Sequence, residues 1–237
     1  RRVTVPRSRE LAVYDGPLLI MLNRYSASAP EILAGAMHDY QRAILAGDTT
    51  TFGKGTVQNI FQLPEGYGAL KVTIAQFYRV SGWSTQNRGV ETSLVLPSLY
   101  NVRDIGESTL DNALPWRSID QVSYQVNGNL KKILPKLKQL SENRIANSEF
   151  FQKVKEDVQE YLTTIKPLKY TSILKMQEDD LRRKTQRDQE LGSVSEKADE
   201  DDSDDTEIEE EKKEIQQDEY MKESLDILSD YIKMQKK

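Results

Sequence analysis

Ser28 and Lys54 are the residues whose types and surroundings suggest chemistry in this sequence of 237 residues. Ser28 precedes a helix-like segment, where backbone N–H groups lack helical partners and carry the positive end of the helix dipole. Lys54 stands between two glycines, which let the backbone approach closely, and Phe52 and Val57 could remove water from its amine. A serine paired with a neutral lysine as general base would be a nucleophile for acyl transfer.

The turn that carries Ser28 would also supply part of an oxyanion hole. A tetrahedral intermediate on Ser28 would place its oxyanion near the N–H of Ala29, whereas Pro30 has no N–H. A second donor must come from elsewhere, and the sequence does not identify it. Gln58, four residues after Lys54, could hydrogen-bond the lysine and orient it.

Other kinds of active site lack the residues that they need. The chain has no cysteine and one histidine, His38, which excludes thiolate nucleophiles, disulfides and zinc sites built on several His or Cys. His38 would lie roughly 15 Å from Ser28 along a helix, too far for a hydrogen bond. No spacing singles out a pair of carboxylates. We therefore expect no metal and no cofactor, and we interpret His38 as a surface or boundary residue of its helix.

Each half of the Ser28–Lys54 pair also has a purely structural explanation. Ser28-x-x-Glu31 is a capping box, and most such sequences only begin a helix. Gly-Lys-Gly at residues 53–55 is typical of an exposed hairpin turn. It does not fit the phosphate-loop pattern G-x-x-x-x-G-K-[ST], because Asp48 stands at the first glycine position and Gly55 follows the lysine.

The segments around this pair alternate between strand and helix patterns. Residues 18–22 are continuously apolar, which is typical of a strand buried on both faces of a layered α/β domain. From residue 29 the apolar positions recur at three- and four-residue steps, which predicts a helix that Gly47 ends, with residues 45–46 open to an extended form. Strands are then predicted at residues 56–63, 70–80 and 93–97.

The second half of the chain differs in charge and in periodicity. Up to Asp104 there are 11 Lys and Arg against 8 Asp and Glu, a net +3, whereas 22 against 30 in the remainder give −8. Helix-like periodicity covers residues 130–140, 149–165, 173–191 and 220–232. We expect an α/β core fragment at residues 1–104 and a mostly α-helical extension at residues 105–237. A disordered acidic linker is expected around residues 192–211.

Charge and hydropathy disfavour two classes of partner. The sequence shows no clustered basic face, so we expect no nucleic acid. The longest apolar run, residues 18–22, is far shorter than the ~20 residues of a membrane helix, so we expect no integral membrane segment. The sequence opens on Arg1 without a methionine or a signal segment, and we interpret it as a piece of a longer precursor.

Two motifs, taken together, resemble one family of peptidases. Tyr-Ser-Ala-Ser-Ala-Pro-Glu-Ile-Leu-Ala-Gly-Ala-Met at residues 25–37 and Thr-Phe-Gly-Lys-Gly-Thr-Val-Gln at residues 51–58 resemble the C-terminal processing peptidases, or tail-specific proteases, which are S41-type. Residues 77–90 look like the later core strands of that family. Residues 114–120 are similar to the C-terminal extension of its periplasmic branch. The resemblance covers nearly all of the chain.

This resemblance implies a serine endopeptidase with a Ser–Lys dyad. It assigns Ser28 as the nucleophile in preference to Ser26, Lys54 as the general base, Gln58 as its supporting residue and the N–H of Ala29 as one oxyanion donor. It implies unfolded or tagged protein substrates recognised through an apolar C-terminus, and a periplasmic location. A PDZ domain and an upstream core strand with the second oxyanion donor are expected in the full-length protein, so this chain alone is expected to be incomplete as an enzyme.

Two departures from the family pattern and one alternative function remain open. The serine and the lysine are 26 positions apart instead of the usual 25, because the loop before Lys54 carries one extra residue, and Pro30 replaces a frequent serine. A non-catalytic scaffold or adaptor, whose helical tail mediates protein interaction or homodimerisation, is the alternative reading. Trp83 could line a peptide groove or cover the core.

Overall fold

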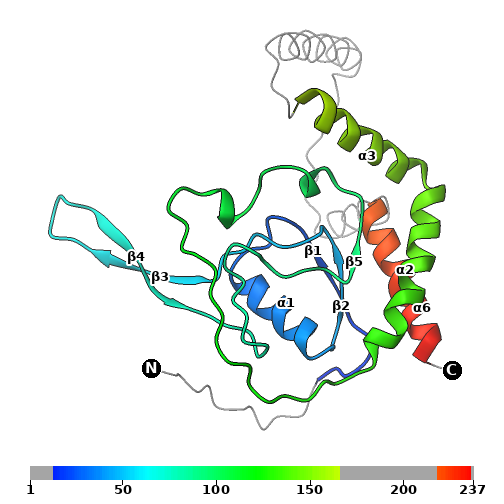
Figure 1. The fold of residues 1–237 in the computed structure, drawn as a ribbon, viewed down its shortest axis with the longest axis horizontal. Helices are drawn as coiled ribbons and strands as arrows, with labels where there is room; N and C mark the ends of the chain where they lie inside the picture. The colour runs from blue at the N-terminus through cyan, green and yellow to red at the C-terminus, as the bar shows by residue number, and fades with distance from the viewer. Residues whose placement is uncertain (1–12, 166–217, 236–237) are drawn as a thin grey trace, which may run out of the picture.

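The computed structural model describes residues 13–165 and 218–235, with strands and one helix first and helices afterwards (Figure 1). This arrangement confirms the expected fold class. The elements are β1 (Leu19–Leu22), α1 (Ala29–Asp39), β2 (Ile44–Gly47), β3 (Thr56–Gln62), β4 (Ala69–Gln76), β5 (Leu94–Val95), the 3₁₀ turns η1 (Leu99–Asn101) and η2 (Glu107–Thr109), α2 (Leu130–Asn147), α3 (Glu149–Glu160), the π-helical turn η3 (Tyr161–Ile165) and α6 (Glu219–Gln235).

A three-stranded parallel sheet in the order β1-β2-β5 lies between two helical layers (Figure 1). Successive side chains of the central strand β2 point to opposite faces. Leu45 packs with Leu22, Ala34 and Val90 on the side of α1. Ile44 and Ala46 belong to the other core, which α2, α3 and α6 cover. Both faces of β2 are therefore buried.

The apolar run at residues 18–22 forms β1, but this strand is only partly buried instead of buried on both faces as predicted. The strand that is buried on both faces is β2. The prediction that the helix continues to about Gly47 was wrong, since α1 ends at Asp39. Gln41 has a positive φ of 53°, which no helix residue adopts, and the chain reverses there into β2. Residues 43–46 are apolar at every position, so they fit the spacing of a helix as well as that of a strand. The sequence pattern therefore did not distinguish β2 from a continuation of the helix.

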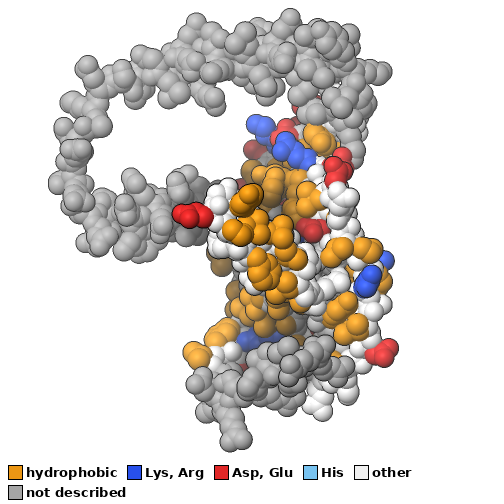
Figure 2. All heavy atoms as spheres, turned by 90° about the vertical axis from the view of Figure 1, so that its left-hand side faces the viewer, with side chains coloured by type: hydrophobic (Ala, Val, Ile, Leu, Met, Phe, Trp, Pro, Cys, Tyr) orange, Lys and Arg blue, Asp and Glu red, His pale blue; other side chains and the backbone are white. Residues whose placement is uncertain are grey.

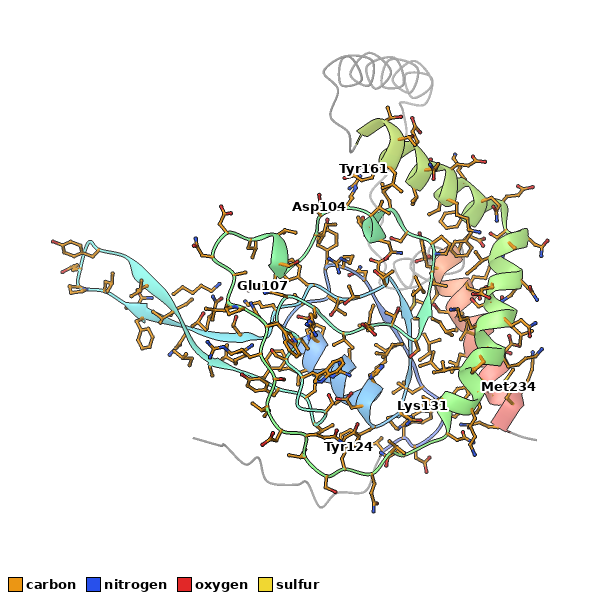
Figure 3. All side chains as sticks on the ribbon, viewed as in Figure 1. Asp104, Glu107, Tyr124, Lys131, Tyr161 and Met234 are labelled. Carbon is orange, nitrogen blue, oxygen red and sulfur yellow. The ribbon has the colours of Figure 1, made fainter. Side chains whose placement is uncertain are left out.

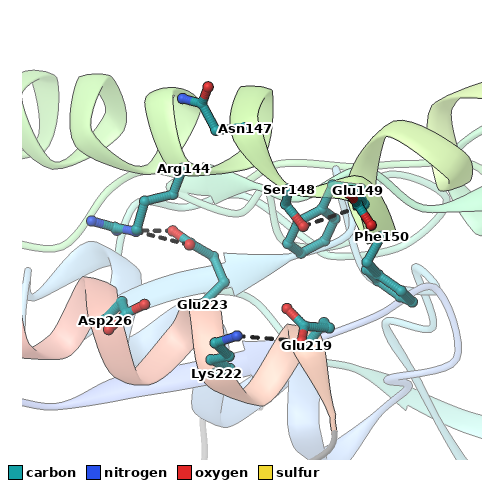
Figure 4. Close-up of a pocket in the computed structure, with 10 residues that line it drawn as sticks. Arg144, Asn147, Ser148, Glu149, Phe150, Glu219, Lys222, Glu223 and Asp226 are labelled. Carbon is teal, nitrogen blue, oxygen red and sulfur yellow. Dashed lines mark hydrogen bonds and ion pairs between the residues drawn. The ribbon is translucent and has the colours of Figure 1, made fainter.

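Helices α2 and α6 are held together by a cluster of ion pairs as well as by apolar packing. Arg144 on α2 donates from Nε to Glu223 of α6 over 2.8 Å (Figure 4). It also donates from Nη1 to Asp230 of α6 over 2.7 Å. The hydrogen bond to Glu223 is the main reason that the pKa of Arg144 is raised. A cavity of about 600 Å³ beside this cluster is lined by residues of α2, α3 and α6, away from Ser28.

The hairpin of β3 and β4 projects from the sheet and pairs with no other strand among residues 13–165 and 218–235 (Figure 1). Both predicted strands are confirmed, although β4 ends at Gln76 instead of residue 80. Its larger exposed apolar side chains are Val57, Ile60, Phe61, Leu70 and Ile74. Figure 2 faces this end of the molecule and shows hydrophobic side chains gathered there.

Residues 105–129 run over the first half of the chain without forming a strand (Figure 3). Tyr124 packs edge to face on Tyr40 at 5.5 Å between ring centroids. Trp116 donates from Nε1 to the carbonyl of Ser84 over 2.9 Å and meets Trp83 at 6.3 Å between ring centroids. Trp83 stays 53% exposed, so it does not cover the core.

Three predictions about the second half have different outcomes. The helices expected at residues 130–140, 149–165 and 220–232 are confirmed, and α2 continues to Asn147. The helix expected at residues 173–191 and the linker expected at 192–211 lie outside the described residues. The division after residue 104 stays a prediction. Within the described part of the chain, no helix has the length and apolar character that a membrane crossing needs.

Candidate active site

Ser28 lies at the N-cap of α1, on the turn that connects β1 to this helix. Its backbone has φ 63° and ψ −107°, which a residue with a side chain rarely adopts. Such a conformation costs roughly 1–3 kcal/mol and persists only where surrounding contacts hold it; these conformations cluster at active sites. The side chain is half-buried.

Glu31 supplies the contacts that hold this turn. Its Oε2 accepts the backbone N–H of Ser28 over 2.8 Å, which is the carboxylate half of the predicted capping box. The same oxygen accepts the backbone N–H of Lys54 over 2.8 Å. Its Oε1 accepts the hydroxyl of Thr51 and the N–H of Gly53, both over 2.6 Å. One carboxylate therefore fixes the serine turn and the lysine segment together.

The Glu31 side chain is fully buried, at 0% exposure. Burial raises its pKa, and the four hydrogen bonds from Thr51, Ser28, Gly53 and Lys54 act in the opposite direction without cancelling the rise. An ionised carboxylate accepts hydrogen bonds and donates none, which matches the four donors that surround it. We therefore assign Glu31 a positioning role.

The glycines on either side of Lys54 are required by close backbone approaches. A Cβ at Gly55 would lie 2.7 Å from the backbone nitrogen of Gln86, and Gly53 has a φ of 95° beside Asn87. Gln86, itself fully buried, accepts the N–H of Gly55 at its Oε1 over 2.9 Å. The lysine segment is thus held between Glu31 on one side and the loop of residues 84–89 on the other. The close backbone approach is the one that the two glycines predicted.

The backbones of Ser28 and Lys54 lie close together in the fold, and no hydrogen bond joins the two side chains among the described residues. Their backbone nitrogens each lie 2.8 Å from Glu31 Oε2, so these nitrogens are at most about 5.6 Å apart, twice that distance. The half-buried side chain of Lys54 has no hydrogen bond or ion pair with any described residue. Its amine therefore has no partner among the described residues.

Ala29 and Gln58, the other predicted site residues, differ in their placement. Ala29 is the first residue of α1, and no described residue accepts a hydrogen bond from its N–H. Since the N–H of Ser28 is occupied by Glu31, the N–H of Ala29 is the donor that the turn offers. Gln58 is exposed on β3 and makes no hydrogen bond to Lys54 within residues 13–165 and 218–235. Its role stays a prediction.

The far end of α1 is anchored by a second buried carboxylate, Asp39. Arg79 donates to it from Nε over 3.0 Å and from Nη2, and the Ser81 hydroxyl donates over 3.1 Å. Burial alone would raise the pKa of Asp39, but hydrogen bonds from His38 and Arg79 and the charge of Arg79 outweigh it and lower the pKa to about 2. The helix behind Ser28 is therefore held at both ends.

The sequence predicted Ser28 and Lys54 as a pair but missed the polar residues that support them. Glu31 was recognised only as a capping residue, although the Ser-x-x-Glu spacing marks it. Thr51 and Gln86 sit in polar stretches that looked like loops, yet both are fully buried. A polar side chain in a loop gives no sequence signal of burial, because its partners are backbone groups far along the chain.

Comparisons with known proteins match both halves of the chain. The family model described as peptidase family S41 matches residues 2–96. The model described as the C-terminal domain of tail specific protease matches residues 100–233, more than half of the chain.

Individual relatives agree with these models. The chain is similar to a tail-specific protease of Haemophilus influenzae, with 44% identity over 140 residues, covering 56% of this chain and 20% of the relative. It is similar to a carboxy-terminal-processing protease of Bartonella bacilliformis, with 45% identity over 102 residues, covering 40% and 23%. The chain thus spans about a fifth of the length of these relatives. A solved photosystem II D1 C-terminal processing protease is 39% identical over 34% of this chain and 20% of that one, with a TM-score of 0.31.

Proposed function

Because the chain belongs to the tail-specific proteases of peptidase family S41, we propose that it is the C-terminal part of a serine endopeptidase with a Ser28–Lys54 dyad. In this proposal residues 1–104 complete the protease core and residues 105–237 form its helical extension. The observation that carries the proposal is the single oxygen of Glu31 that accepts the N–H of both dyad residues.

The proposed reaction begins when the neutral amine of Lys54 takes the hydroxyl proton of Ser28. The serine oxygen attacks the peptide carbonyl carbon, and the resulting oxyanion accepts the N–H of Ala29. Lys54 then gives its proton to the leaving amine as the C–N bond breaks, which leaves an acyl-serine. A water molecule, deprotonated by Lys54, attacks this ester and releases the new carboxyl end, and Ser28 regains its proton.

A lysine acts as a base only when its surroundings disfavour the charged amine. The half-buried side chain of Lys54 has no anionic partner among the described residues, and such a partner would favour the charged form. We propose that the part of the relatives that this chain does not span buries the amine further and adds a second oxyanion donor, along with a PDZ domain. Gln58 would orient the amine in that complete site.

The substrates and the location follow from the family in the same way. We propose that the complete protein cleaves unfolded or tagged proteins recognised through an apolar C-terminus, and that it works in the bacterial periplasm. We also propose that the helical extension provides the surface for homodimerisation.

The proposal is tested in the full-length protein with Ser28→Ala, Lys54→Ala and Lys54→Arg. Cleavage of an unfolded substrate with an apolar C-terminus is expected to fall at least about 10³-fold in all three. Arginine keeps the positive charge and cannot act as a base, so Lys54→Arg separates general-base catalysis from simple charge placement. Activity within tenfold of the unmodified enzyme in any of the three would rule out the dyad. Glu65→Gln, at an exposed hairpin turn, is the matched control and keeps full activity.

A further inference from the structure

A cavity of about 280 Å³ lies where the parallel strands β1, β2 and β5 end. Leu22 at the end of β1 and Leu96 just after β5 line it, and Ser26 on the turn after β1 forms part of its rim. The opposite wall is Tyr220, in the first turn of α6. Ligands of open parallel α/β sheets bind at the carboxyl ends of the strands, which is where this cavity opens.

This cavity adjoins the proposed nucleophile. Ser26 precedes Ser28 by two residues, and two residues span at most about 7 Å of extended chain. The carbonyl of Ser26 accepts the N–H of Phe52 over 3.0 Å, so the rim is tied to the lysine segment as well. A polypeptide bound with one carbonyl at Ser28 therefore has a neighbouring side chain within reach of the cavity.

The walls of the cavity are apolar, and its fixed charges are negative. Met21 and Tyr100 line it together with two carboxylates, Asp48 and Asp218. Asp48 is only 4% exposed; one of its oxygens accepts the N–H of Arg24 over 2.8 Å, and its other oxygen has no hydrogen bond with a described residue. Neither carboxylate forms an ion pair within residues 13–165 and 218–235. These two charges are thus not neutralised by the described part of the chain.

The pKa of Tyr220 responds to the negative charges that line the cavity. Its hydroxyl donates to the carbonyl of Pro97 over 2.9 Å, which fixes its place in the wall. Its pKa is raised, first by burial and then by the charges of Asp48 and Asp218. Both carboxylates therefore act on the wall that Tyr220 forms, Asp48 from a buried position and Asp218 from an exposed one. An acidic side chain would be repelled there, and a purely apolar one would leave the free oxygen of the buried Asp48 without a hydrogen bond.

We propose that this cavity is a subsite for a lysine or arginine side chain of a polypeptide substrate, next to Ser28. The aliphatic stem of such a side chain packs on Met21, Leu96 and Tyr100, while its cationic head meets Asp48 and Asp218. The proposal rests on the proposed function and adds a substrate preference to it. It also gives the helical extension a part in substrate binding, since Asp218 and Tyr220 belong to it.

The test uses the full-length protein with ¹³C-methyl-labelled methionine and two small probes. Nα-acetyl-lysine methylamide carries the cationic head, and Nα-acetyl-norleucine methylamide carries the same stem without it. The lysine probe is expected to shift the Met21 methyl signal in a saturable manner and to bind about tenfold more tightly than the norleucine probe. Met37 and Met234, which pack in the two cores, are internal references and stay unshifted.

Two matched substitutions, one at the cap of α6 and one on α6, separate the effect of a charge in the cavity from the effect of a lower net charge. Asp218→Asn removes the charge but keeps an oxygen that caps α6, and it is expected to weaken lysine binding about fivefold without changing norleucine binding. Asp226→Asn removes the same charge from an exposed site outside this cavity and leaves both affinities unchanged. Equal affinity for the two probes, or an unshifted Met21 signal, overturns the subsite. Since no hydrolysis is measured, this result is independent of the Ser28 and Lys54 substitutions above.

Discussion

The backbone N–H groups of Ser28 and Lys54 donate to one and the same atom, Oε2 of Glu31, each over 2.8 Å. The two residues are 26 positions apart and no hydrogen bond joins their described side chains. Their relative position therefore depends on a third residue, which contacts the backbone and leaves both functional groups unoccupied. Glu31 is the residue whose loss would separate the pair.

Glu31→Gln is expected to destabilise the fold because an amide has one acceptor oxygen where the carboxylate has two. The amide nitrogen would face two backbone or hydroxyl donors, and each unsatisfied buried donor costs about 1–3 kcal/mol. We expect the free energy of unfolding in urea to fall by about 2–4 kcal/mol. Glu65→Gln, on the exposed β3–β4 turn, changes it by less than about 0.5 kcal/mol. A similar effect of both substitutions would contradict the role of Glu31.

Ser28→Gly is expected to stabilise the protein while removing the nucleophile. Glycine adopts a φ of 63° without the strain that a side chain brings, so relief of that strain gives about 0.5–2 kcal/mol after the entropic cost of glycine. Ser148 is also an N-cap, with an ordinary φ of −90° and a hydroxyl that accepts the N–H of Phe151. Ser148→Gly therefore costs a few tenths of a kcal/mol. Opposite signs in thermal unfolding of the two variants confirm the strain, and equal signs refute it.

Asp39 predicts a loss of stability in acid. Its pKa of about 2 lies below the ordinary value of 3.8, so its contribution is present above pH 4 and disappears as the pH falls towards 2. A shift of this size corresponds to about 2 kcal/mol at 1.36 kcal/mol per unit. Asp39→Asn should therefore show a weaker fall in urea stability between pH 4 and pH 2 than the unmodified chain. Asp111→Asn, at an exposed position, retains the full fall. Parallel pH profiles for Asp39→Asn and the unmodified chain would exclude this origin.

Arg144→Met is expected to loosen α6 from α2. It leaves Glu223, only 4% exposed, without its cation, and breaking a buried pair from one side costs about 3–5 kcal/mol. Because the Arg144 side chain is 30% exposed, we expect about 2–3 kcal/mol in urea unfolding. Lys138→Met removes an exposed i,i+4 partner of Glu142 on the same helix and costs at most about 0.5 kcal/mol. A loss at Arg144 no larger than that at Lys138 would show that the cluster does not hold the helices.

Local patterns predicted the elements around the candidate site well. The capping box at Ser28 and Glu31 marked the start of α1, and the strand patterns at residues 56–63 and 70–80 marked the hairpin. Both signals lie within a few residues, which is why sequence reasoning finds them. The end of α1 was predicted too late, and β2 was anticipated only as a possible extended form of residues 45–46, since a continuous apolar run satisfies helix and strand periodicity equally.

Such local patterns could not predict polar contacts between residues that are far apart in the sequence. Asp39 pairs with Arg79 across 40 positions, and Gln86 accepts the N–H of Gly55 across 31. Neither separation leaves a trace in composition or spacing. Ser28 and Lys54 were found as a pair because elimination removed other chemistries and a family resemblance supplied their connection. The residues that hold them in place required the fold.

The central strand β2 faces α1 on one side and α2 and α6 on the other, and this arrangement sets an order of events during synthesis. The ribosome completes α1 and β2 before α6, which begins only at Glu219. At about 5–20 residues per second, the face of β2 that carries Ile44 and Ala46 waits roughly 10–35 s for its last cover. The newborn chain thus carries an exposed apolar sheet face until α6 has emerged, and a chaperone that shields this face would act during that interval.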